Sequence, residues 1–171
     1  MNPDQLRSLQ APLKKQYHDQ PAAARITLRA DGRLGDGVTC SVSTGQALVK
    51  AGLHPATGGD GLAACSGDML LQALVACAGV TLNAVATALG IVLRDANVRA
   101  EGDLDFRGTL GVSKEAPVGF QAIRLHFELD TDASQEQLAT LLRLTERYCV
   151  VYQTLAHAPA LTVTRHAAAT G

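Results

Sequence analysis

The four cysteines are the residues of this chain best suited to chemistry, because a thiolate is a strong nucleophile. No C-x-x-C pair occurs and the five histidines are scattered, so the spacing does not predict a zinc site. We therefore expect redox chemistry if a cation or hydrogen bonds stabilise one thiolate. The alternative is that the cysteines are small buried side chains, as free cysteines commonly are. They are Cys40, Cys65, Cys77 and Cys149.

Cys77 lies in the middle of residues 66–89, which we predict to be a helix ended by Gly90. No charged residue occurs between Asp68 and Arg94. A helix of this length could cross a membrane, but its polar side chains and the lack of flanking aromatic anchors favour a helix buried in a soluble core. Those polar residues are Gln72, Thr81, Asn83 and Thr87.

Cys149 is expected on a second helix that follows Ser134. Ser134 and Gln137 have the spacing of a capping box. Each helix must bury its inward face, and packing the two faces together would bring Cys77 and Cys149 close to one another. The residues that recur at helical spacing on the inward face are Leu138, Leu141, Leu142, Thr145, Tyr148, Cys149 and Tyr152.

The apolar helix offers no cation to Cys77, so an arginine would have to come from elsewhere in the chain. Arg25, Arg29 and Arg33 are the candidates, and the alternative for each is a solvated surface residue. Asp68 lies nine residues before Cys77, about two and a half turns, and cannot touch its sulfur. It could orient an arginine, or could simply be a carboxylate favoured at a helix N-terminus.

The remaining chain predicts an α+β fold with helices packed on an antiparallel sheet. Residues 1–24 are expected to form an N-terminal helical arm, and residues 25–171 the main domain. Residues 45–61 hold six glycines and prolines and predict a long loop. Alternation of apolar and polar residues predicts a hairpin over residues 25–42 and strands over residues 97–107, 121–129 and 161–164.

Composition excludes several classes of function. The net charge is −1 and there is no tryptophan, so nucleic-acid binding is not expected. Phosphate-loop, dinucleotide and hydrolase signatures are absent from the sequence, and no metal or organic cofactor is expected. The first ten residues lack the pattern of a signal peptide, so we expect a cytoplasmic protein without a membrane association.

Three stretches resemble the OsmC/Ohr family. Residues 67–77, GDMLLQALVAC, are similar to the family pattern P-E-x-L-L-x-A-L-x-x-C. Residues 146–151, ERYCVV, are similar to its second cysteine motif, usually C-P-V. Residues 101–108 and 119–123 resemble its middle strands. The likeness runs in the right order from about residue 25 to residue 165.

The resemblance implies an OsmC-like fold, with two long central helices and antiparallel sheets in an intertwined homodimer. It implies a thiol peroxidase that reduces organic hydroperoxides and is itself reduced by an external dithiol. By position, Cys77 would be the peroxidatic thiol and Cys149 the resolving thiol. Asp68 falls where the family has a catalytic Glu, and Arg33 falls near its thiolate-activating Arg.

Two departures from the family pattern bear on this expectation. Asp68 is one methylene shorter than Glu and follows Gly67 rather than proline. Val150 replaces the proline that usually follows the second cysteine. The alternative function is therefore a small-molecule binding or stress-related protein on the same fold, in which the thiols are not catalytic.

Overall fold

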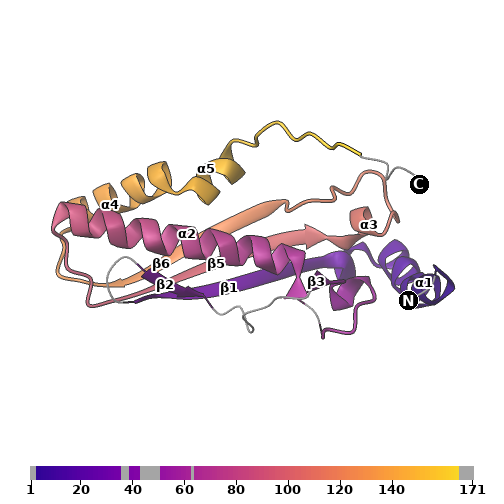
Figure 1. Ribbon diagram of the computed structural model, residues 1–171. Helices are drawn as coiled ribbons and strands as arrows, with labels where there is room; N and C mark the ends of the chain where they lie inside the picture. The colour runs from indigo at the N-terminus through magenta and orange to yellow at the C-terminus, as the bar shows by residue number, and fades with distance from the viewer. Residues whose placement is uncertain (1–2, 36–38, 43–50, 63, 166–171) are drawn as a thin grey trace, which may run out of the picture.

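The chain folds around a four-stranded antiparallel sheet with the strand order β2-β1-β5-β6 (Figure 1). The computed structural model describes residues 3–35, 39–42, 51–62 and 64–165, and of residues 3–7, 9, 27–35, 39–42 and 51 only the backbone. The predicted α+β class and antiparallel sheet are confirmed. The strands of this sheet are β1 (Arg25–Gly35), β2 (Thr39–Val42), β5 (Asp95–Asp105) and β6 (Ala122–Asp130).

One face of the sheet is apolar because buried and half-buried residues alternate along β5. Ala96, Val98 and Ala100 are buried, whereas the residues between them belong to the polar face. On that polar face Arg124 of β6 makes a two-pronged ion pair with Asp103 of β5, at 2.6 and 2.9 Å. The alternation therefore supplies a single apolar face, against which a helix packs.

That helix is α2 (Ser66–Leu89), which contacts β1, β2 and β5 and also packs against the C-terminal helices. It ends at Gly90, as predicted, in the left-handed region at a φ of 66°. By length and composition α2 could cross a membrane. In this structure, however, one side of it forms the core, and these buried residues are Leu71, Leu74, Val75, Ala78, Gly79, Leu82 and Ala86.

The second predicted helix is present but broken. Helix α4 (Gln135–Tyr148) begins with the expected capping box between Ser134 and Gln137. It ends before Cys149, whose backbone is extended (φ −71°, ψ 108°), and α5 (Val150–Ala156) follows. The prediction that Cys149 lies within a continuous helix is therefore wrong, although Cys149 is buried as expected. Helical spacing persists across a short break, so periodicity alone does not reveal it.

Two strand predictions also need correction. The strand predicted over residues 97–107 ends at Asp105, because its side chain accepts the N–H of Arg107 and starts the short helix α3 (Phe106–Thr109). Residues 161–164 have the alternation of a strand but no strand partner in the described part of the chain. Leu161 and Val163 are 89% and 96% exposed. Alternation of apolar and polar residues indicates that a segment can form a β-strand. The strand forms only where the edge of a sheet is available for hydrogen bonding.

The N-terminal arm and the predicted loop pack together. Helix α1 (Pro3–Asp19) and the 3₁₀ turn η1 (Pro21–Ala24) precede β1. Tyr17 is buried, and its hydroxyl donates to the carbonyl of Ala56 in the 3₁₀ turn η2 (Pro55–Thr57). Residues 45–50 of the predicted loop lie outside the described residues. The rest of it contains β3 (Ala51–Gly52), which pairs in parallel with β4 (Ala64–Cys65).

Candidate active site

Cys77 and Cys149 lie in direct contact. Cys77 is half-buried on α2, and Cys149 is only 1% exposed at the break between α4 and α5. The thiol of Cys149 donates a hydrogen bond to the Cys77 sulfur. The packing of the two helical segments thus brings together the two thiols that helix periodicity predicts to be close.

Four donors surround the Cys77 sulfur and favour its charged form. Burial by itself raises the pKa of Cys77, but hydrogen bonds from the N–H of Val151, the Cys149 thiol, the N–H of Val150 and the Thr81 hydroxyl outweigh it. The pKa of Cys77 therefore lies below its usual value. A lowered pKa increases the fraction of thiolate, which is the nucleophilic form.

Cys149 has the opposite electrostatic environment. The pKa of Cys149 is raised to about 11, first by burial and then by its donation to Cys77 and the charge on that sulfur. A hydrogen bond to the Cys149 sulfur from the N–H of Tyr152 at 3.5 Å only partly opposes this shift. The contact therefore joins Cys77, whose thiolate form is favoured, to Cys149, which keeps its proton at neutral pH, and these are the properties required of a nucleophile and its resolving partner.

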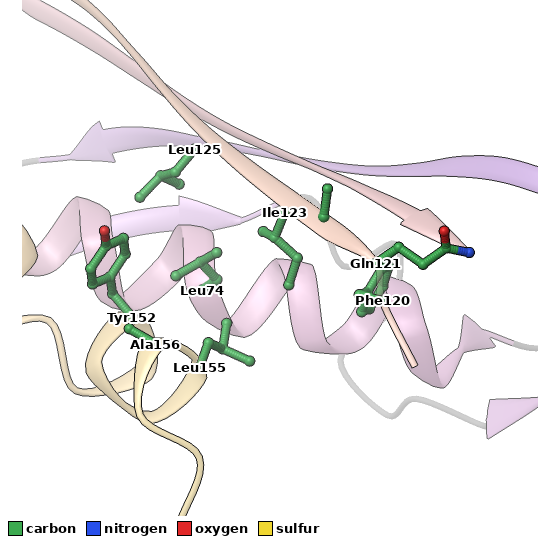
Figure 2. Close-up of a pocket in the computed structure, with 9 residues that line it drawn as sticks. Leu74, Phe120, Gln121, Ile123, Leu125, Tyr152, Leu155 and Ala156 are labelled. Carbon is green, nitrogen blue, oxygen red and sulfur yellow. The ribbon is translucent and has the colours of Figure 1, made fainter. Parts of the chain in front are cut away.

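An apolar groove opens beside this thiol pair. Its volume is about 330 Å³. Figure 2 shows the side chains that line it, which come from α2, from α5, from β6 and from the residues just before β6. Leu74 lies three residues before Cys77 and Tyr152 lies three residues after Cys149, so each of these two lining residues is about one helical turn along the chain from a cysteine. Its other lining residues are Phe120, Gln121, Ala122, Ile123, Leu125, Leu155 and Ala156.

Phe120 is held in this groove by the strand beneath it. Its ring lies over Gly102 of β5, where an added Cβ would come within 2.4 Å of a ring carbon. Any larger residue at Gly102 would have to displace the ring. This glycine therefore allows an aromatic side chain to close one end of the groove.

The structure does not bring a described arginine to Cys77. Among the described side chains, none of the groups that shift the pKa of Cys77 is a cation. Arg25 lies 4.0 Å from Asp105, which is bound more closely by Arg107 at 2.6 Å. Arg29 and Arg33 lie on β1, and their side chains lie outside the described residues, so the role of Arg33 stays a prediction. The backbone of Arg33 pairs with that of Asn97.

Asp68 is in the first turn of α2, at a distance along the helix that keeps it away from Cys77. Burial raises the pKa of its carboxyl, and the nearby His54 imidazole opposes this shift. His54 itself stacks on Phe106, with ring centroids 5.1 Å apart. An interaction of Asp68 with an arginine stays a prediction.

The raised pKa of Asp68 gives a pH-dependent expectation. The folded state binds the proton more tightly than the unfolded state, so the carboxylate lowers stability at neutral pH. This loss of stability disappears as the pH falls from above the pKa of Asp68 in the folded state to below its pKa in the unfolded state. In the surroundings that the structure describes, where burial and His54 are the only causes of the shift, Asp68→Asn should therefore raise the melting temperature at pH 7 and leave it unchanged near pH 3. A lower melting temperature at pH 7 would overturn this expectation and would show that a cation, such as the predicted Arg33, outweighs the burial of the carboxylate.

The other two cysteines stand apart from this pair. Cys65 is half-buried at the N-cap of α2, twelve residues before Cys77. Cys40 lies on β2, where only the backbone is described. Among the described residues, no group of three or more histidine, cysteine or acidic side chains is placed to hold a metal ion.

Sequence reasoning missed three contributions to the thiol pair. Thr81 is one helical turn after Cys77, and only its spacing could have suggested a role. The N–H groups of Val150 and Val151 are backbone donors and leave no trace in residue type. The side chain of Gln153 donates to the carbonyl of Glu146 at 2.8 Å across the break between α4 and α5.

Known proteins share this architecture. The model of the family described as OsmC-like protein matches residues 58–164, which include both thiols. The crystal structure of an OsmC-like hydroperoxide resistance protein from Jannaschia sp. CCS1 has a TM-score of 0.59 and 18% identity, over 86% of this chain and 97% of that chain. The structure of an OsmC-like protein from Mycoplasma pneumoniae has a TM-score of 0.55 and 17% identity, over 78% and 86% of the two chains. A search of the curated proteins gives no match.

Proposed function

Because the chain belongs to the OsmC-like protein family, we propose that it is a thiol-dependent peroxidase that reduces organic hydroperoxides to alcohols. The observation that carries this proposal is the contact between a thiol of lowered pKa, Cys77, and a protonated buried thiol, Cys149. A peroxide-related role agrees with the neighbour that is described as a hydroperoxide resistance protein.

The first step is a displacement at oxygen. The Cys77 thiolate attacks the terminal oxygen of the hydroperoxide, an S–O bond forms, and the O–O bond breaks. Cys77 becomes a sulfenic acid, and the alkoxide that leaves takes a proton and departs as an alcohol. Sulfur is oxidised by two electrons and the peroxide is reduced by two, so the step needs no metal or organic cofactor.

The second step closes a disulfide. Cys149 attacks the sulfenic sulfur of Cys77, an S–S bond forms, and the hydroxyl group leaves as water with the proton of Cys149. The hydrogen bond between the thiols supports this step because it holds the reacting sulfurs in contact. An external dithiol then reduces the disulfide by two exchange reactions.

The groove favours a hydroperoxide with an apolar substituent. Burying such a substituent against Leu74, Ile123 and Leu155 stabilises the complex by about 25 cal/mol for each Å² removed from water. Hydrogen peroxide has no group to place there. We therefore propose organic hydroperoxides as the substrate class.

Two further elements belong to the proposal. Arg33 would stabilise the thiolate and the leaving oxygen, with Asp68 holding its guanidinium. The protein would act in the cytoplasm as a homodimer, which would cover the exposed apolar side chains of Val80 on α2 and of Leu161 and Val163 in the C-terminal segment.

Turnover with a dithiol reductant tests the proposed function. With dithiothreitol in excess, the protein should consume cumene hydroperoxide catalytically and release the alcohol. At equal concentration, hydrogen peroxide should react about tenfold more slowly or worse, because about 1.4 kcal/mol of lost burial is a tenfold change in rate. If neither peroxide is consumed, the thiols are not catalytic and the alternative of a small-molecule binding protein gains support.

A further inference from the structure

At the break between α4 and α5, a side chain takes the place of a backbone N–H as the donor to one helix carbonyl. The helical hydrogen bonds of α4 continue as far as the N–H of Cys149, which donates to the carbonyl of Thr145 at 2.9 Å. In a continuous helix the next donor, the N–H of Val150, would bond to the carbonyl of Glu146. That carbonyl instead accepts Nε2 of Gln153 at 2.8 Å.

The replaced backbone donor is used elsewhere. The N–H groups of Val150 and Val151 donate to the Cys77 sulfur. The Cys149 backbone is extended at this point, and the hydrogen bond of α5 resumes only with the N–H of Gln153 donating to the carbonyl of Cys149 at 2.9 Å. The same break that interrupts the helix therefore supplies two backbone donors to the nucleophile.

We propose that Gln153 is a positioning residue that keeps the helix open at Cys149, so that the N–H groups of Val150 and Val151 stay directed at the Cys77 thiolate. The inference deepens the proposed function, since it concerns the reactivity of the same sulfur. Without the Gln153 amide, the carbonyl of Glu146 loses its donor. The N–H of Val150 is then drawn back to that carbonyl, as in an ordinary helix, and leaves Cys77.

Replacing Gln153 with methionine tests this role. Gln153→Met keeps an unbranched side chain of similar size and charge but removes the donor. The readout is the rate of iodoacetamide alkylation at Cys77 as a function of pH, followed by mass spectrometry of the Cys77 peptide. We expect the midpoint of this profile to rise by about one pH unit, a tenfold change in acidity, because a charge-assisted hydrogen bond is lost. Gln135→Met, at the exposed start of α4, is the matched control and should leave the midpoint unchanged.

The variant Val150→Pro has no N–H at residue 150. It therefore distinguishes an effect of Gln153 that acts through this N–H from any other effect of Gln153 on Cys77. The extended backbone of Cys149 suits a residue before proline, and the first position of a helix tolerates proline. The Val150 side chain is 70% exposed, so little packing is lost. Val150→Pro should raise the midpoint because one donor to Cys77 is gone, whereas Val150→Ala should not.

The double variant decides the mechanism. Proline has no N–H to return to the Glu146 carbonyl, so adding Gln153→Met to Val150→Pro should shift the midpoint much less than Gln153→Met does alone. An unchanged midpoint in Gln153→Met, or an equal shift in both backgrounds, would overturn the inference. Because alkylation needs no peroxide, this result is independent of whether the wild-type protein turns over hydroperoxides.

Discussion

Replacing Cys77 with serine is expected to lower the rate of hydroperoxide reduction by on the order of 10³-fold or more, as removal of a covalent nucleophile does in other enzymes. A serine hydroxyl has almost the same shape, so the packing of α2 should survive. It is not ionised at neutral pH, however, and the donors around residue 77 do not lower its pKa far enough to change that. The measurement is the initial rate of cumene hydroperoxide consumption with dithiothreitol in excess.

Cys65→Ser is the matched control for this variant. Cys65 is also half-buried and belongs to the same helical region, but it stands at the N-cap of α2, away from Cys149. Its replacement should leave the rate within about a factor of two, as expected for a residue outside the reacting pair. Substantial activity in Cys77→Ser, with circular dichroism unchanged, would contradict the assignment of Cys77 as the nucleophile.

Replacing Cys149 with serine is expected to separate the two chemical steps. The serine hydroxyl can still donate to Cys77, so the first attack on the peroxide should proceed. The disulfide cannot form, and the sulfenic acid at Cys77 should persist and be trapped by dimedone. Turnover should fall by on the order of 10²-fold, because an external thiol must replace a neighbour that the fold holds in contact.

The Cys149 variant has a distinct signature in thiol counts. One equivalent of hydroperoxide should consume one thiol per chain in Cys149→Ser and two in the wild type. A dimedone adduct at Cys77 should appear in the variant and be nearly absent from the wild type. Loss of two thiols in Cys149→Ser would show that another cysteine, such as Cys65, resolves the sulfenic acid.

Much of the fold could be predicted because its signals are local. The alternation in β6, the capping box at Ser134 and the terminating Gly90 each depend on neighbouring residues, and the structure has all three. The contact of Cys77 with Cys149 followed from the requirement that two apolar helix faces be buried together. Residue type and period were sufficient for these features.

The structure differs from the prediction where the local conformation depends on backbone hydrogen bonds or on residues far away in the sequence. The break at Cys149 depends on one side-chain hydrogen bond from Gln153, and a glutamine at that position has no special spacing. The donors from Val150 and Val151 are backbone groups, which every residue except proline carries. Residues 161–164 alternate like a strand, but alternation does not specify which edge a strand joins.

The most direct test of the central claim is to locate the bond that peroxide creates. The reduced protein is treated with one equivalent of cumene hydroperoxide, the remaining thiols are blocked, and the peptides are mapped by mass spectrometry without reduction. The account predicts rapid loss of two thiols per chain and a peptide pair joined through Cys77 and Cys149. A wild-type protein that keeps all four of its thiols through many equivalents of peroxide, or that joins a different pair, would contradict it.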